Sequence, residues 1–271
     1  MFELGVGPVF TNGWKAFTEH IGKAVLFALI YGVGILILMI PFALIFGAAF
    51  MSALMAGGAG GEQAANLQAA LAGGSMVVFF IVYIIVMIVL LGWVAGFIHS
   101  LKLLILGDDP DFGQMFSQFR KIGNLILLGI IMGICIGIGF FLLIIPGLVL
   151  LVMWSQAYLL VVDKDMDAMS ALSASWKRVA GDFWSVLGIL LLLMIVGGVV
   201  SGVLGMIPFI GSLVTLLLVM PWLVFCQWSL YYALFPPARE AATEAAGAGV
   251  PPPPPPPPPD QPKPDDEMTL K

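Results

Sequence analysis

The chain has 271 residues, of which 61% are hydrophobic and only 10% are charged. Ordinary soluble domains are roughly 45–50% apolar and about a quarter charged, so a soluble fold of this length could not cover so much apolar surface. The composition excludes a soluble enzyme and predicts that lipid is the solvent for most of the chain.

Apolar runs, taken in chain order, predict six membrane-spanning helices. They cover approximately residues 23–54, 75–106, 124–145, 147–162, 183–206 and 210–235. Pro146 and Gly147 mark a tight turn between the third and fourth spans, and Pro208 and Gly211 mark another between the fifth and sixth. We therefore expect an all-α polytopic membrane protein whose six transmembrane helices form three hairpins.

The positions of the cations predict the orientation of these spans. All 11 lysine and arginine residues lie before spans one, three and five or after spans two, four and six, and the opposite-side loops contain none. Cytoplasmic loops are enriched in lysine and arginine, so both termini are predicted to be cytoplasmic and the Gly/Ala-rich segment 56–74 to lie outside. The net charge is −5 and no basic run exists, so we expect no nucleic-acid partner.

An amphipathic segment precedes each of spans one, three and five, and each is predicted to form a helix in the cytoplasmic interface. Asp109-Pro110-Asp111 is expected to start the second of these helices, and Asp163, Asp165 and Asp167 to open the third. The predicted membrane-interface anchors are the aromatic residues Trp14, Phe17, Phe116, Phe119 and Trp176.

The same order of features occurs three times within residues 10–235. Each amphipathic segment ends near a glycine, at Gly22, Gly123 or Gly181, where we expect a change of direction. A proline follows at Pro41, Pro146 or Pro208, and Pro41 is expected to kink its helix. The pattern indicates a threefold repeat, although any hairpin protein with amphipathic linkers would look similar.

Small residues recur at every fourth position in three spans, a spacing that lets helix backbones approach closely. They are Ala24, Ala28 and Gly32 in span one, Gly129, Gly133 and Gly137 in span three, and Gly197, Ser201 and Gly205 in span five. The pattern predicts close helix packing, and it leaves open whether the partner helix belongs to the same chain or to a homo-oligomer.

Residues able to carry chemistry are scarce. Every acidic residue is expected in a loop or at an interface, which argues against ion coupling through intramembrane carboxylates. The polar residues predicted inside the spans are interpreted as hydrogen-bonding contacts between helices; they are His99, Ser100, Ser155, Gln156, Ser201 and Gln227. No catalytic, cofactor or metal site is predicted, and we do not expect an enzyme.

Residues 236–271 are predicted to be a disordered, proline-rich, acidic cytoplasmic tail. Nine consecutive prolines, Pro251 to Pro259, would form a stiff extended rod. The rod is interpreted as a solvated spacer, and the alternative is a cytoplasmic partner that binds it in an aromatic groove.

Three stretches carry a resemblance to a known family. They are Ile145-Pro146-Gly147-Leu148, Val161-Val162-Asp163-Lys164 and the segment from Ala171 to Lys177. The chain resembles the YciC-like family of uncharacterised bacterial six-helix inner-membrane proteins and, more distantly, the membrane domain of glycerophosphodiester phosphodiesterases. The resemblance implies a bacterial inner-membrane protein with both ends inside the cell, and it brings no catalytic residues.

Two functions are compatible with these features. The first is a non-enzymatic membrane scaffold or organising component in contact with the lipid bilayer. The alternative is a passive transporter or channel for lipids or small amphiphilic molecules. A continuous polar path lined by Gln156, Ser201 and Gln227 would favour the transporter, and a solid apolar core would count against it.

Overall fold

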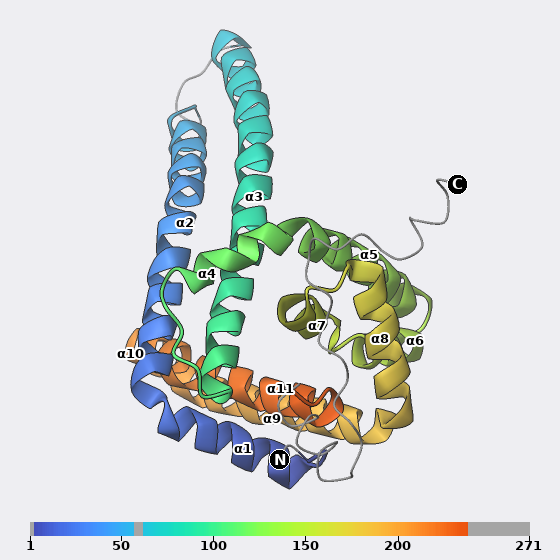
Figure 1. Cartoon of the computed structure of the whole chain (residues 1–271). Coiled ribbons are helices and arrows are strands. Elements are labelled where there is room, and N and C mark those ends of the chain that lie inside the picture. Colours follow the sequence, from blue (N-terminus) through green and yellow to red (C-terminus); the bar gives the residue numbers. More distant parts are fainter. Residues whose placement is uncertain (1–2, 57–61, 238–271) are drawn as a thin grey trace, which may run out of the picture. The chain divides into compact units, whose positions relative to one another are not determined.

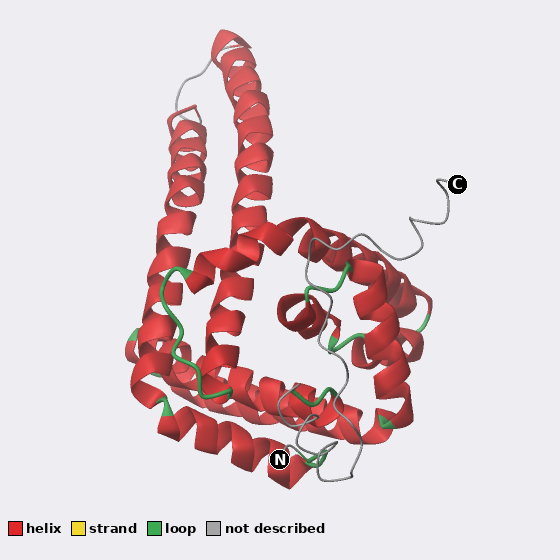
Figure 2. Cartoon of the chain, viewed as in Figure 1, coloured by secondary structure: helices red, strands yellow, loops and turns green. Residues whose placement is uncertain are grey.

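The computed structural model describes residues 3–56 and 62–237, so residues 238–271 of the predicted proline-rich tail lie outside the described residues. Residues 2–234 form one compact unit, the helical body, and residues 235–271 belong to a second. Across the described residues the chain is helical and contains no strand (Figure 2).

The prediction of six spans is confirmed, since six helical segments in the described part of the chain are long and apolar enough to cross a membrane. The protein is therefore an all-α, multi-pass membrane protein that contacts the lipid bilayer (Figure 1). The six segments are Ile21–Pro41, Phe80–Ile105, Gln114–Leu142, Ile144–Lys164, Phe183–Gly205 and Ile210–Leu234.

The first hairpin is longer than its membrane spans. Helix α2 is Ile21–Ala56 and α3 is Glu62–Ile105, and the two run side by side beyond the other helices (Figure 1). Residues 62–74, predicted as part of an external loop, instead continue α3. Alanine and glutamine are good helix formers, which explains why this polar extension stays helical. Pro41 lies inside α2.

The turn of the second hairpin is one residue long. Helix α5, Ile122–Leu142, is followed by the extended residue Leu143 and then by α6, Ile144–Met153. Pro146 and Gly147 thus lie in the first turn of α6 and not in the loop, where proline is tolerated because its missing N–H would have had no partner. Gly147 lies against Gly139, whose added Cβ would come within 2.9 Å of the Gly147 Cα.

Two of the spans are interrupted. Span four consists of α6 and α7, Ala157–Lys164, with a break at residues 154–156. Span six consists of α10, Ile210–Val214, a π-helical segment η2, Thr215–Val219, and α11, Met220–Leu234. Pro221 lacks the N–H that an α-helix would use at that point, which accounts for the altered hydrogen bonding just before it.

The third hairpin connects α9, Phe183–Gly205, to α10 through residues 206–209. Pro208 lies in this turn, and Phe209 has a φ of 63°, a left-handed value that is uncommon outside glycine. Gly211 belongs to the first turn of α10, and an added Cβ there would overlap the carbonyl oxygen of Leu204. The tight approach of α9 and α10 therefore requires glycine at this position.

The three amphipathic segments are present, but they differ in length. The first is α1, Val6–Glu19, and the third is α8, Ala168–Gly181. The second is only α4, Gln114–Ser117, followed by the 3-10 turn η1, Gln118–Lys121. Asp109-Pro110-Asp111 precedes α4 without capping it, because the residue at its N-terminus is Gly113.

The changes of direction after these segments do not depend on glycine. The chain bends at His20 before α2 and at Asp182 before α9. Gly22 and Gly123 lie inside the following helices, Gly181 ends α8, and none of the three has a positive φ. The predicted glycine hinges are therefore wrong, since ordinary backbone values at neighbouring residues already redirect the chain.

Both long amphipathic helices pack on protein through small residues. In α1 the buried face includes Val9, Gly13 and Ala16, and it lies against α11, where an added Cβ on Gly13 would come within 2.8 Å of the Cys226 Cα. In α8 the buried face includes Ala171 and Ser175. These helices therefore belong to the helical body and do not lie on lipid alone.

The small-residue pattern gives a mixed result. Ala24 and Ala28 are fully buried, and an added Cβ on Gly32 or Gly197 would meet a leucine of span six. At Gly129, Gly133, Gly137 and Gly205, in contrast, an added Cβ would meet nothing within 4 Å. Within the described chain these four glycines do not mediate close helix packing, because no described atom occupies the space where their Cβ would lie.

Candidate functional site

A buried ion pair joins two of the spans. Lys102, in the last turn of α3, lies 2.8 Å from Asp163, in the last turn of α7, measured from Nζ to Oδ1. The side chains are 12% and 14% exposed. Asp163 was expected to open the following interfacial helix, but it lies inside a span. A charged side chain that is removed from water needs a partner of opposite charge, and Lys102 and Asp163 are such partners for each other.

The second oxygen of Asp163 is also engaged. The Tyr231 hydroxyl of α11 donates a hydrogen bond of 2.7 Å to Asp163 Oδ2 (α7). Tyr231 is fully buried and packs against Trp228, whose indole N–H donates to the Ile98 carbonyl of α3 at 3.0 Å. The carboxylate of Asp163 thus connects α3, α7 and α11.

A second lysine, Lys121 of η1, contacts the end of α7. Lys121 Nζ lies 2.7 Å from Asp165 Oδ1 and donates to the Val162 carbonyl at 2.7 Å. Asp165 follows α7 with a left-handed φ of 52°. Aspartate tolerates this conformation better than most residues. Asp165 therefore ends α7. The prediction that it opens α8 is wrong. We call Lys102, Lys121, Asp163, Asp165 and Tyr231 the polar cluster.

Only Asp167 acts as the predicted cap of α8. Its carboxylate accepts a hydrogen bond of 3.1 Å from the Ser170 N–H. Hydrogen bonding by Ser170, through its side chain and its backbone, lowers the pKa of the Asp167 carboxyl. Because the folded-state pKa is lowered, the cap stabilises α8 at neutral pH, and this contribution is lost as the pH falls through the lowered pKa.

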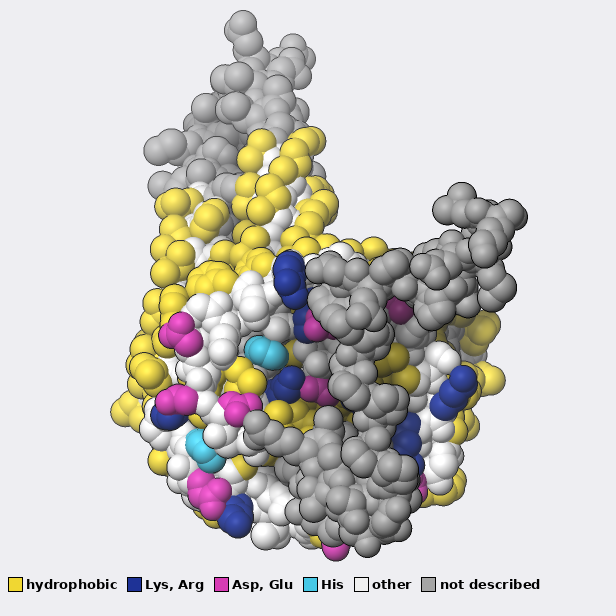
Figure 3. All heavy atoms as spheres, viewed as in Figure 1, with side chains coloured by type: hydrophobic (Ala, Val, Ile, Leu, Met, Phe, Trp, Pro, Cys, Tyr) yellow, Lys and Arg dark blue, Asp and Glu magenta, His cyan; other side chains and the backbone are white. Residues whose placement is uncertain are grey.

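Further polar contacts place the cation-bearing helix ends together. Lys23, at the start of α2, lies 2.8 Å from Asp109, and Arg178 donates to the Leu234 carbonyl at the end of α11. Figure 3 shows lysine, arginine, aspartate and glutamate side chains intermingled on one face, while hydrophobic side chains predominate on the coloured part of the hairpin of α2 and α3 above it. The ends of the spans that carry lysine and arginine therefore lie together at one end of the helical body.

The two histidines of the chain lie apart from each other. His20 makes a hydrogen bond from Nδ1 to the Ala16 carbonyl oxygen at 3.1 Å. His99 lies one turn before Lys102, and its Nδ1 is buried without a hydrogen-bond partner among the described residues. In the part of the chain that is described, no group of three or more histidine, cysteine, aspartate or glutamate residues is placed to hold a metal ion.

The break in span four is held by α8. The Ser175 hydroxyl donates a hydrogen bond of 2.7 Å to the Met153 carbonyl at the end of α6. Gln156, within the break, is fully buried; its amide N–H donates to Ser155, and its Oε1 has no partner among the described residues. The interruption thus places a polar side chain inside the helical body, within the same span that carries Asp163.

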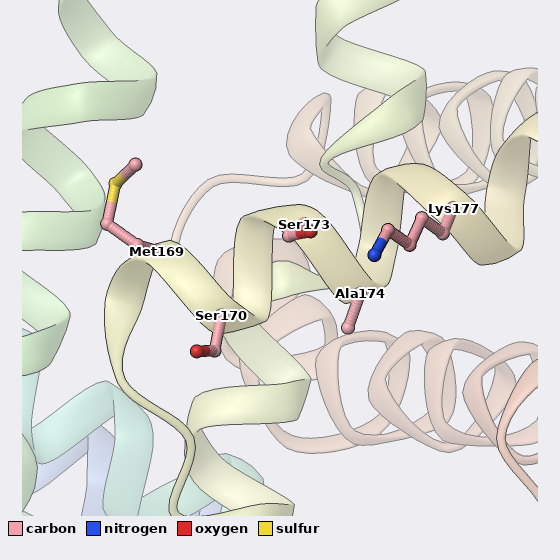
Figure 4. A pocket seen from close by; sticks show the side chains of 5 residues that line it. All are labelled: Met169, Ser170, Ser173, Ala174 and Lys177. Carbon is pink, nitrogen blue, oxygen red and sulfur yellow. The ribbon is translucent and has the colours of Figure 1, made fainter.

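The polar path considered for a transporter is not assembled around the recess that contains Ser201. That recess, of about 310 Å³, lies between α9 and span six, and neither Gln156 nor Gln227 lines it. A second recess, of about 520 Å³, lies on the outer face of α8 (Figure 4). All its described lining residues come from this one helix: Met169, Ser170, Ser173, Ala174 and Lys177.

The predicted interface anchors fall into two groups. Trp14, Phe116 and Trp176 are exposed, as an anchor requires. Phe17 is buried in the core, and Phe119 is half-buried against Gly92 of α3. Phe17 and Phe119 are therefore packing residues of the helical body, because the faces of α1 and η1 that carry them turn toward protein.

Sequence reasoning missed the polar cluster. The available signal was one lysine and one aspartate at the ends of two apolar runs, with a tyrosine near the end of a third.

Comparisons with known families, curated proteins and solved structures find no match for this chain. The fold and the spans define an integral, multi-pass membrane protein, and the expected family resemblance stays a prediction.

Proposed function

We propose that this membrane protein is a non-enzymatic scaffold or organising component of the bacterial inner membrane, with both termini in the cytoplasm. The observation that carries the proposal is the polar cluster. Its charges are matched by protein partners: Lys102 and Tyr231 occupy both oxygens of Asp163, and Lys121 pairs with Asp165. Such an arrangement holds helices together and leaves no unmatched charge there for a substrate.

The exposed aromatic residues support the same proposal. Trp14 on α1, Phe116 on α4 and Trp176 on α8 leave apolar surface at the charged end of the helical body. Aromatic side chains favour the membrane interface, where they would change the packing of nearby lipids. This proposal includes three further parts. They are membership of the YciC-like family, a cytoplasmic position for the lysine and arginine residues, and a cytoplasmic partner that binds Pro251 to Pro259.

We expect vesicles that contain the protein to show higher lipid order than protein-free vesicles. The measurement is the generalised polarisation of Laurdan in phosphatidylethanolamine/phosphatidylglycerol vesicles at a fixed protein-to-lipid ratio. The combined variant Trp14→Asp, Phe116→Asp and Trp176→Asp should lose more than half of this shift, because each charge disfavours insertion. Ser173→Asp, on the polar side of α8, is the matched control and should keep it. Equal shifts for both variants would contradict the proposal.

A passive lipid transporter is the second candidate, and one observation favours it. Interrupted helices with buried polar groups form substrate sites in many transporters, and span four has this character at Gln156. The same vesicles, carrying a fluorescent phospholipid, distinguish the two functions. A scaffold leaves transbilayer exchange at the protein-free rate. Rapid exchange that Gln156→Leu abolishes would overturn the scaffold in favour of the transporter.

A further inference from the structure

The recess between α9 and span six has a composition unlike its surroundings. Among the residues that line it, three carry hydroxyl groups, although the adjoining helices are almost wholly apolar. The lining residues are Ser201, Gly205, Ser212, Thr215, Leu216 and Met220. None of the three hydroxyls makes a hydrogen bond within the described part of the chain. A hydroxyl that faces lipid without a partner is costly, so these groups need an acceptor from outside the chain.

The lining of the recess changes along the axis of span six. Ser212 and Gly205 lie next to the turn at residues 206–209, while Leu216 and Met220 lie progressively farther from it. Along span six the lining therefore runs from Ser212 near the turn, through Thr215 next to Leu216, to Met220 toward the middle of the span. An amphiphile with its polar part at the membrane boundary and its chain pointing inward would match this order.

The depth of the recess indicates which part of an amphiphile it would meet. Helix α9 has 23 residues and is about 34 Å long, close to the roughly 30 Å thickness of a hydrocarbon core. Ser201 lies about 6 Å before the end of α9. Ser201 is therefore placed less than about one helical turn inside the boundary of the hydrocarbon core, next to the interfacial region that holds the ester groups of phospholipids.

From this arrangement we infer that the recess binds the diacylglycerol ester region of a phospholipid, with the hydroxyls donating to the ester carbonyls and an acyl chain lying along Leu216 and Met220. No charged residue is among the described residues that line the recess, so the inferred contact is with the ester region and not with the headgroup. Ester carbonyls are acceptors available at this depth, and no side chain or backbone of the described chain bonds the three hydroxyls. The inference goes beyond the proposed scaffold and does not depend on it.

The test compares two lipids that differ only in these carbonyls. The purified full-length protein is incubated with equal amounts of palmitoyl-oleoyl phosphatidylcholine and its dialkyl ether analogue, and retained lipid is measured by native mass spectrometry. We expect the ester lipid to be retained about tenfold in excess, because two hydrogen bonds in a membrane together give roughly this preference. Equal retention of the two lipids by the wild-type protein would overturn the inference.

Two variants with matched controls locate the site. Combined Ser201→Ala, Ser212→Ala and Thr215→Val should bring the ratio close to one, while Ser185→Ala, at the opposite end of α9, should leave it unchanged. Gly205→Leu should reduce retention of both lipids, because its side chain fills the recess where an added Cβ meets nothing within 4 Å. Gly202→Leu, equally unobstructed, is its control. An unchanged ratio in the triple variant, or a wild-type dimer that Gly205→Leu dissociates, would overturn the lipid assignment.

Discussion

Replacing Lys102 by methionine should lower the free energy of unfolding by about 3–5 kcal/mol. The substitution leaves the Asp163 carboxylate buried without its cation, and desolvation of an unpaired charge is costly. The measurement is unfolding of the full chain in mixed micelles by increasing SDS, followed by circular dichroism at 222 nm and by tryptophan fluorescence.

Lys15→Met is the matched control, because Lys15 pairs with Glu19 across 3.9 Å while both side chains are more than half exposed. It should change the free energy of unfolding by less than about 0.5 kcal/mol. The double variant Lys102→Met with Asp163→Leu should recover much of the loss, since it removes the unpaired charge. If Lys102→Met and Lys15→Met destabilise equally, the buried pair does not hold α3 and α7 together.

Alanine should have opposite effects at two glycines of the spans. At Gly96 of α3 an added Cβ would overlap the Met115 carbonyl oxygen of α4, so Gly96→Ala should destabilise the protein by about 2 kcal/mol. At Gly133 of α5 an added Cβ meets nothing within 4 Å, so Gly133→Ala should stabilise it by up to about 1 kcal/mol through helix propensity.

The same SDS titration measures both glycine variants. Backbone contact between α3 and α4 is possible only without a side chain at Gly96, which explains the expected loss. A loss at Gly133 similar to that at Gly96 would mean that the exposed face of α5 packs against a second chain. Such a result would contradict the expected gain and favour a homo-oligomer.

The charged end of the helical body was partly predictable. Cation positions alone grouped the ends of the spans, and the contacts of Lys23 with Asp109 and of Lys102 with Asp163 bring those ends together. Pairing partners could not be predicted, because Lys102 and Asp163 are 61 residues apart along the chain, and Asp163 and Tyr231 are 68 residues apart. Periodicity within one helix carries no information about which side chain of another helix it meets.

The predictions for Phe17 and Phe119 and for four of the small residues were wrong for a related reason. Phe17 and Trp14 look equivalent as bulky residues on α1, yet Phe17 is buried and Trp14 is exposed. Gly96 and Gly133 look equivalent as glycines within spans, yet only Gly96 contacts another backbone. The rotation of each helix about its own axis separates these cases, and that rotation depends on neighbours remote in sequence.

Sequence by itself determined the membrane class, the number of spans and the grouping of the charged ends. These properties depend on hydropathy and charge summed over short windows, which are local quantities. Only the tertiary structure decided that Asp163 is buried beside Lys102, that spans four and six are interrupted, and that three hydroxyls meet in one recess. In lipid an apolar helix has no preferred inner face, so hydropathy cannot distinguish its protein contacts from its lipid contacts, and packing alone distinguishes them.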